Sequence, residues 1–91
     1  MKNRRARDIV REIEEEIGNI VLNFVELYNS GANLEKLKDY LGFMLCPKYY
    51  DETIIKASDK EQLLLYVLSD FITRYRSFLL RNLGAKSISE A

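Results

Sequence analysis

The residues of this 91-residue chain that could do chemistry are carboxylates, arginines and one cysteine, because the sequence contains no histidine. Ser-His and Cys-His nucleophile pairs and His-ligated metal sites are therefore excluded. Cys46 has no adjacent basic residue to activate it, so we interpret it as a small apolar side chain. We expect no catalytic residue, no cofactor and no bound metal, and a protein that is not an enzyme.

Carboxylates are the one remaining option for a metal site. Glu12, Glu15 and Glu16 can share one face of a helix, and hard cations such as Mg²⁺ accept carboxylate ligands. All-α nucleotide pyrophosphohydrolases carry E-x-x-E on one helix and E-x-x-D on the next. Here Glu12 and Glu15 supply the first half, but Glu35 and Asp39 are four residues apart and the second half is missing. A solvated acidic face explains the glutamates better, so a carboxylate-metal hydrolase is the third-ranked hypothesis.

A basic cluster near the N-terminus suits a polyanion. Residues 1–11 hold five cations against one acidic residue, a net charge of +4, and cation–phosphate contacts give a salt-dependent affinity. Four glutamates follow within residues 12–16, however, and the whole chain balances 14 basic against 14 acidic residues. Nucleic-acid binding is therefore the runner-up hypothesis. Its residues would be Lys2, Arg4, Arg5, Arg7, Arg11, Arg74, Arg76 and Arg81.

The strongest structural pattern runs from Ser58 to Gly84, where apolar residues recur at helical spacing with no internal glycine or proline. Ser58 and Glu61 match a capping box, and Gly84 suits a helix end. At about 100° per residue the apolar side chains span roughly 160°, wider than the roughly 100° stripe of a surface helix. We therefore predict a central helix that is contacted from two sides. The arc comprises Leu64, Val67, Leu68, Phe71, Ile72, Tyr75, Phe78 and Leu79.

Two further helices precede this one. Residues 4–29 carry apolar residues at steps of three and four, which predicts a long amphipathic helix. Asn33 is a suitable N-cap for a shorter helix from Leu34 to about Leu45, which Pro47 ends. Asp51 could cap one more turn over residues 53–56. The predicted fold is all-α: one domain over residues 1–91, a small antiparallel bundle of two long helices and one short, with a possible extra turn in the 47–57 connection and frayed ends at 1–3 and 85–91.

Helix length argues for self-association. Two helices of about 26 residues span roughly 39 Å each, whereas about 12 residues span roughly 18 Å. One chain would then leave apolar residues near the N-terminus without partners, and a second copy could cover them. In a competing interpretation the 47–57 segment folds back and closes the gap. The predicted interface residues are Ile9, Val10, Ile13, Leu22, Phe43 and Leu80.

The bulk composition sets the remaining expectations. An apolar content of 47% is enough for one core. No window approaches 18 consecutive apolar residues and the N-terminus lacks the apolar region of a secretory signal, so we expect no membrane association. One cysteine suits a reducing, cytoplasmic compartment. We predict a non-enzymatic assembly or adaptor module that works through protein–protein contacts and forms a homodimer.

Overall fold

The computed structural model describes residues 6–84, and all the regular secondary structure within that range is helical. The predicted all-α bundle of two long helices and a short one is confirmed, and the 47–57 connection contains the extra helical turn. The last helix is continuous but includes two π-helical turns, η1 and η2. The elements are α1 (Ala6–Asn29), α2 (Leu34–Met44), α3 (Glu52–Lys56), α4 (Lys60–Tyr66), η1 (Val67–Phe71), α5 (Ile72–Leu79) and η2 (Leu80–Gly84).

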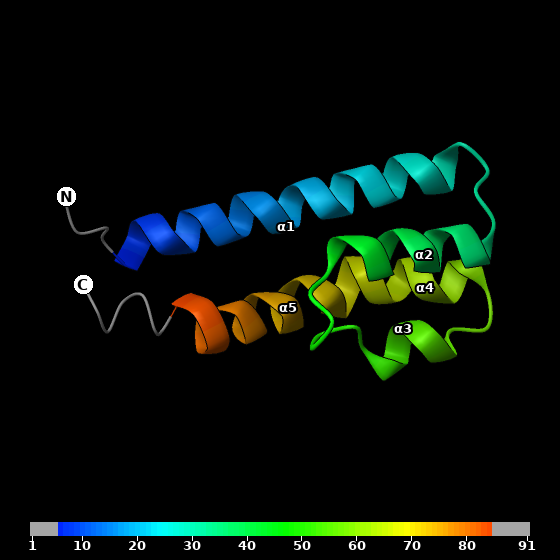
Figure 1. Ribbon diagram of the computed structural model, residues 1–91. Helices are drawn as coiled ribbons and strands as arrows, with labels where there is room; N and C mark the ends of the chain where they lie inside the picture. The colour runs from blue at the N-terminus through cyan, green and yellow to red at the C-terminus, as the bar shows by residue number, and fades with distance from the viewer. Residues whose placement is uncertain (1–5, 85–91) are drawn as a thin grey trace.

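The two long helices run antiparallel along the whole molecule. Figure 1 shows α1 beside α4 and α5, with α2 covering only the half of the bundle that contains α4. The short α3 lies on the far side of α4 from α1. The half of the bundle that contains α5 therefore consists of two helices. Residues outside the three longest helical segments must bury the rest of its apolar side chains.

Polar side chains fix where three of the helices begin. Asn33 accepts a hydrogen bond from Lys36 N at 2.8 Å, and Asp51 accepts one from Thr53 N at 2.9 Å, which confirms both predicted caps. The predicted capping box of Ser58 and Glu61 is wrong by one residue.

The actual cap of α4 is Asp59, whose Oδ1 accepts from Gln62 N at 2.7 Å. Gln62 in turn accepts from the backbone N–H and the hydroxyl of Ser58, so the reciprocal pattern is present but shifted by one position. An aspartate caps at least as well as a serine, and its charge also interacts favourably with the positive end of the helix dipole.

The core confirms the predicted seam of α1 and corrects the argument from helix length. Ile17, Ile20 and Phe24 are almost fully buried. Ile9 and Ile13, which we expected to lack partners within one chain, are also buried, at 7% and 8% exposure. They are covered because α5 and η2 pack against this half of α1.

The 47–57 segment closes the side that α2 does not reach, as the competing interpretation proposed. The Tyr49 ring lies 6.1 Å from Phe71, 4.6 Å from Tyr75 and 5.3 Å from Phe78, between ring centroids. Ile54 of the same segment is fully buried. This aromatic cluster supplies the cover that a longer α2 would have given.

The last helix faces the core differently from the prediction. Leu68 and Ile72, both assigned to the apolar arc, are 51% and 40% exposed, whereas Leu63 and Tyr66 are buried. The cause is η1, because a π turn closes its hydrogen bond one residue later than an α turn and changes the helical phase. The buried residues after α4 consequently recur every fourth position: Val67, Phe71, Tyr75 and Leu79.

Truncation of Phe71 should be strongly destabilising, because its side chain is fully buried and touches the tyrosine rings around it. We expect Phe71→Ala to lower the free energy of unfolding by about 3–5 kcal/mol in urea denaturation. Ser69→Ala, at an exposed position of the same turn, should change it by no more than about 0.5 kcal/mol. Equal losses from the two variants would contradict this orientation of the helix.

Candidate functional site

A surface groove runs between α1 and the last helix. Glu14 and Gly18 line it from α1, and Ile72 and Arg76 line it from α5. Arg76 Nε lies 3.0 Å from Glu14 Oε2, so an ion pair bridges the two walls. Because the helices are antiparallel, residues at one level have numbers that add up to 90, as 14 with 76 and 18 with 72 do.

Two exposed leucines lie one turn beyond the groove. Leu22 and Leu68 follow Gly18 and Ile72 at four-residue steps along their helices, and their numbers again add up to 90. Both side chains are more than half exposed, at 58% and 51%. We call the six residues of these three levels the open face: Glu14, Gly18, Leu22, Leu68, Ile72 and Arg76.

Further apolar side chains border the open face. Val21, Val25 and Leu64 are half-buried and pack against the core, and Leu65 is 67% exposed. Single exposed leucines are ordinary on a protein surface, but a contiguous apolar patch indicates a contact site. Both long helices thus carry exposed apolar side chains in addition to those packed against the core.

Gly18 is the one residue of the open face whose type lowers the stability of the helix that contains it. A glycine inside a helix costs about 1 kcal/mol relative to alanine. A Cβ placed at Gly18 would meet no other atom of the described chain within 4 Å. Packing within this chain therefore does not explain the glycine, and space for a close neighbour remains above it.

A hydrogen-bonded polar cluster lies on the other side of the last helix. The Tyr49 and Tyr66 hydroxyl oxygens are 3.1 Å apart, and the Tyr66 hydroxyl donates to Asp51 Oδ2 at 3.0 Å. Arg74 Nη1 lies 3.5 Å from the same carboxylate oxygen. The four residues come from the 47–57 segment, α4 and α5, so the cluster fastens that segment to the helix.

The ionisation of this cluster favours the observed hydrogen bonds. Burial alone would raise the pKa of Asp51, but hydrogen bonds from Thr53 and Tyr66 and the charge of Arg74 together lower it. Burial, followed by the hydrogen bond with Tyr49, raises the pKa of Tyr66 well above its usual value. Asp51 is thereby held as an acceptor and Tyr66 as a donor.

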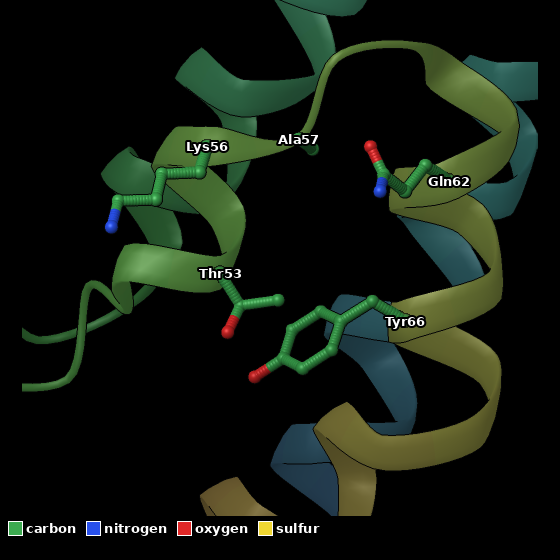
Figure 2. Close-up of a pocket in the computed structure, with 5 residues that line it drawn as sticks. All are labelled: Thr53, Lys56, Ala57, Gln62 and Tyr66. Carbon is green, nitrogen blue, oxygen red and sulfur yellow. The ribbon is translucent and has the colours of Figure 1, made fainter.

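A small hollow adjoins the cluster between α3 and α4. Figure 2 shows the Tyr66 ring and the Gln62 amide on one side and Thr53 on the other, while the Lys56 ammonium points away. Its volume of about 150 Å³ is below the roughly 300–1,000 Å³ of typical small-molecule sites. The hollow offers little room for a ligand.

The predicted nucleic-acid residues meet in part at one end of the bundle. Arg7 and Arg11 are exposed near the start of α1, and Arg81 is exposed in η2, which packs against α1. Arg74 and Arg76 are instead engaged by acidic side chains on opposite sides of the last helix. Three predicted residues lie outside the described part of the chain: Lys2, Arg4 and Arg5.

Charge at this end is mixed. Four exposed arginines of the described chain occur there, at positions 7, 11, 76 and 81, together with five acidic residues at positions 8, 12, 14, 15 and 16. Their formal charges nearly cancel, +4 against −5. The end is therefore a charge-patterned surface within residues 6–84, and not a uniformly basic one.

The predicted interface residues separate into three groups. Ile9 and Ile13 belong to the core, and Val10 is half-buried. Leu80 is also half-buried and packs against the core. Leu22 and Phe43 are exposed, at 58% and 85%, but Phe43 lies on α2 and not on the open face.

The sequence prediction missed the leucines of the last helix as surface residues. Leu63, Leu64 and Leu65 are consecutive, and a helix can turn only part of such a run toward its core. The run of three leucines therefore indicates that at least one of them is exposed. The structure buries Leu63 and exposes Leu65.

Neither a metal site nor a membrane span is found in the described chain. Within residues 6–84, no three acidic or cysteine side chains lie close enough together to hold a metal ion. None of the helices described is long and apolar enough to cross a bilayer.

Comparison with protein-family models, with curated proteins and with solved structures found no match to this chain. Functional inference therefore rests on the chain's own surface.

The polar cluster should make stability depend on pH. Because folding lowers the pKa of Asp51, its charge stabilises the fold above the unfolded pKa of about 4, and this contribution is lost as pH falls through the folded value. We expect Asp51→Asn, which keeps a helix cap, to cost on the order of 1 kcal/mol at pH 7 and less at pH 3. Urea denaturation of both proteins at the two pH values measures this. A difference that is the same at pH 3 and pH 7 would contradict it.

Proposed function

We propose that this protein is a non-enzymatic assembly module that binds another polypeptide through the open face. The observation that carries the proposal is the exposure of large apolar side chains on α1 and the last helix, the two helices that line the groove. Leu22, Leu65 and Leu68 are each more than half exposed there. Burial of apolar surface is the main driving force of protein association, at about 25 cal/mol per Å².

The composition of the face suits a protein partner. Its centre is apolar and one end carries the ion pair of Glu14 with Arg76, so it has an apolar core with a polar rim as protein interfaces do. Two parallel rows of side chains with a groove between them accept an amphipathic helix. These features favour a helical partner over a small molecule.

A charge placed on the face should abolish binding and leave the fold intact. Leu68→Glu and Ser69→Glu add the same charge at neighbouring exposed positions, but only the first lies on the open face. We expect wild-type protein used as bait to retain a polypeptide, another copy of the chain included, from an extract of the source cells. The Leu68→Glu bait should lose it, whereas the Ser69→Glu bait should keep it.

Circular dichroism of the two variants controls for folding. Since both positions are exposed, we expect each melting temperature to remain close to that of the wild type. Identical retention by wild type and Leu68→Glu would remove the open face as the binding surface.

Nucleic-acid binding is the second candidate function, supported by the exposure of Arg7 and Arg11 on α1 and of Arg81 on η2, which packs against α1. If that end binds phosphates, Arg7→Ser with Arg11→Ser should elute from heparin at lower salt than the wild type, since each lost contact weakens a salt-dependent affinity. Leu68→Glu should elute with the wild type. Elution of the double variant at the wild-type salt concentration excludes a contribution from these two arginines.

A further inference from the structure

We propose that the 47–57 segment is a strap that opens and closes as one unit, while the helices on either side of it stay folded. When the strap opens, Tyr49 leaves the aromatic rings of the last helix, so the open form presents an aromatic surface that the closed form buries. Surfaces of this kind, exposed only in a minor conformation, are known as cryptic sites. The strap lies on the other side of the last helix from the open face, so the inference does not depend on the proposed function.

The strap can leave its place without unwinding the neighbouring helices. α2 ends before it, with the hydrogen bond from the Leu45 N–H to Leu41 O at 3.0 Å. α4 begins after it, at its cap Asp59. Neither of these helix ends depends on a residue of the strap. The chain therefore has its two hinges at Cys46 and Ser58, between the helix ends and the strap.

The strap contains little that would keep it closed by itself. Its one helix, α3, has five residues, far fewer than the roughly 12–15 that an isolated helix needs in water. Its buried residues are Tyr49, Ile54 and Ala57, and the others are exposed or half-buried. Segments with few buried contacts open before the rest of a structure does. The strap is therefore held by its attachments to other helices.

Three consecutive residues attach the strap to different helices. Tyr49 packs against the rings of the last helix. Tyr50 reaches α2, where its hydroxyl donates to Lys38 O at 3.2 Å. Asp51 accepts a hydrogen bond from Tyr66 of α4 at 3.0 Å. Because consecutive Cα atoms are only about 3.8 Å apart, releasing one of these attachments displaces the next, which favours a single cooperative opening.

Lys38 of α2 holds the strap at two places. Its carbonyl oxygen accepts from the Tyr50 hydroxyl, near the start of the strap. Its ammonium group donates to Ile55 O at 2.7 Å, near the end of the strap. A hydrogen bond from a charged donor is stronger than one between neutral groups. Lys38 thus connects both ends of the strap to one residue of α2, and loss of its ammonium should loosen both ends together.

Gly42 provides the seat on which Tyr50 rests. A Cβ at Gly42 would lie 3.2 Å from Cε1 and 3.3 Å from Cζ of the Tyr50 ring, closer than ordinary van der Waals contact. The ring therefore packs on the backbone of α2 without an intervening side chain. An alanine at this position would push the ring outward and strain the closed strap. Gly18 of α1 has no such neighbour, since a Cβ there would meet no atom of the described chain within 4 Å.

Native-state hydrogen exchange of the full chain, followed by NMR, tests whether the strap opens as a unit. The Tyr49 and Ile54 amides are hydrogen-bonded within or next to the strap, and the Phe24 amide of α1 reports global unfolding. The exchange rate of each amide gives an equilibrium constant for opening. We expect one shared opening constant for Tyr49 and Ile54, at least about tenfold larger than that of Phe24. Two different constants, or constants equal to that of Phe24, overturn the proposal.

A pair of lysine variants tests the connection through Lys38. Lys38→Met keeps the aliphatic stem and removes the ammonium group. It should raise the opening constants of Tyr49 and Ile54 by the same factor, about three- to tenfold, as expected for one lost hydrogen bond. Lys36→Met, at an exposed position of the same helix, should leave both constants unchanged. An increase at Ile54 alone would show that the two ends open separately and would overturn the strap as a unit.

A pair of glycine variants tests the seat. Gly42→Ala should raise the opening constants of the strap amides at least about threefold, because the strain is present only in the closed form. It should change that of Phe24 less, since alanine also favours α2 over the unfolded chain. Gly18→Ala should lower the constant of Phe24 and leave those of the strap unchanged. Strap amides that respond alike to the two alanines would contradict the attachment of the strap through Tyr50.

Discussion

The packing of Tyr49 against Phe71, Tyr75 and Phe78 makes the remaining architecture possible. α2 holds 11 residues and α1 holds 24, so α2 cannot accompany α1 over its whole length. The aromatic ring from the 47–57 segment fills one side of the half that α2 leaves uncovered. Its hydroxyl is held by Tyr66, which is itself bonded to Asp51 at the start of α3. One side of the bundle is thereby closed, and the other side remains as the open face.

The sequence predicted the helices well because their first residues are determined by N-cap hydrogen bonds between residues close together in the chain. Asn33 and Asp51 cap their helices through backbone groups two or three residues away, a distance that a sequence pattern can represent. The seam of α1 was predicted equally well, since Ile17, Ile20 and Phe24 follow one uniform helical period. These features depend on neighbours along the chain and need no tertiary information.

The candidate site was harder to predict because it depends on helical phase. The assumption of about 100° per residue from Ser58 to Gly84 placed Leu68 and Ile72 toward the core. η1 interrupts that period, and the amino-acid composition of Val67–Phe71 does not predict a π turn. The burial of Ile9 and Ile13 was missed for a different reason, namely that it depends on how α5 and η2 pack against the first half of α1. The positions of the helices could be predicted, but the faces of the last helix on which Leu68 and Ile72 lie could not.

The π turn η1 also has a consequence for how this helix tolerates change in length. Losing one residue from an α-helix ordinarily rotates everything beyond it by about 100° and turns buried positions outward. A π turn already contains one residue more than an α turn needs, because its hydrogen bond closes from i to i+5. Removing one residue between Val67 and Phe71 would convert it to a regular turn and leave Tyr75 and Leu79 facing α1. The segment Val67–Phe71 therefore holds a spare residue, and natural variation in the length of this helix is expected there before anywhere else in it.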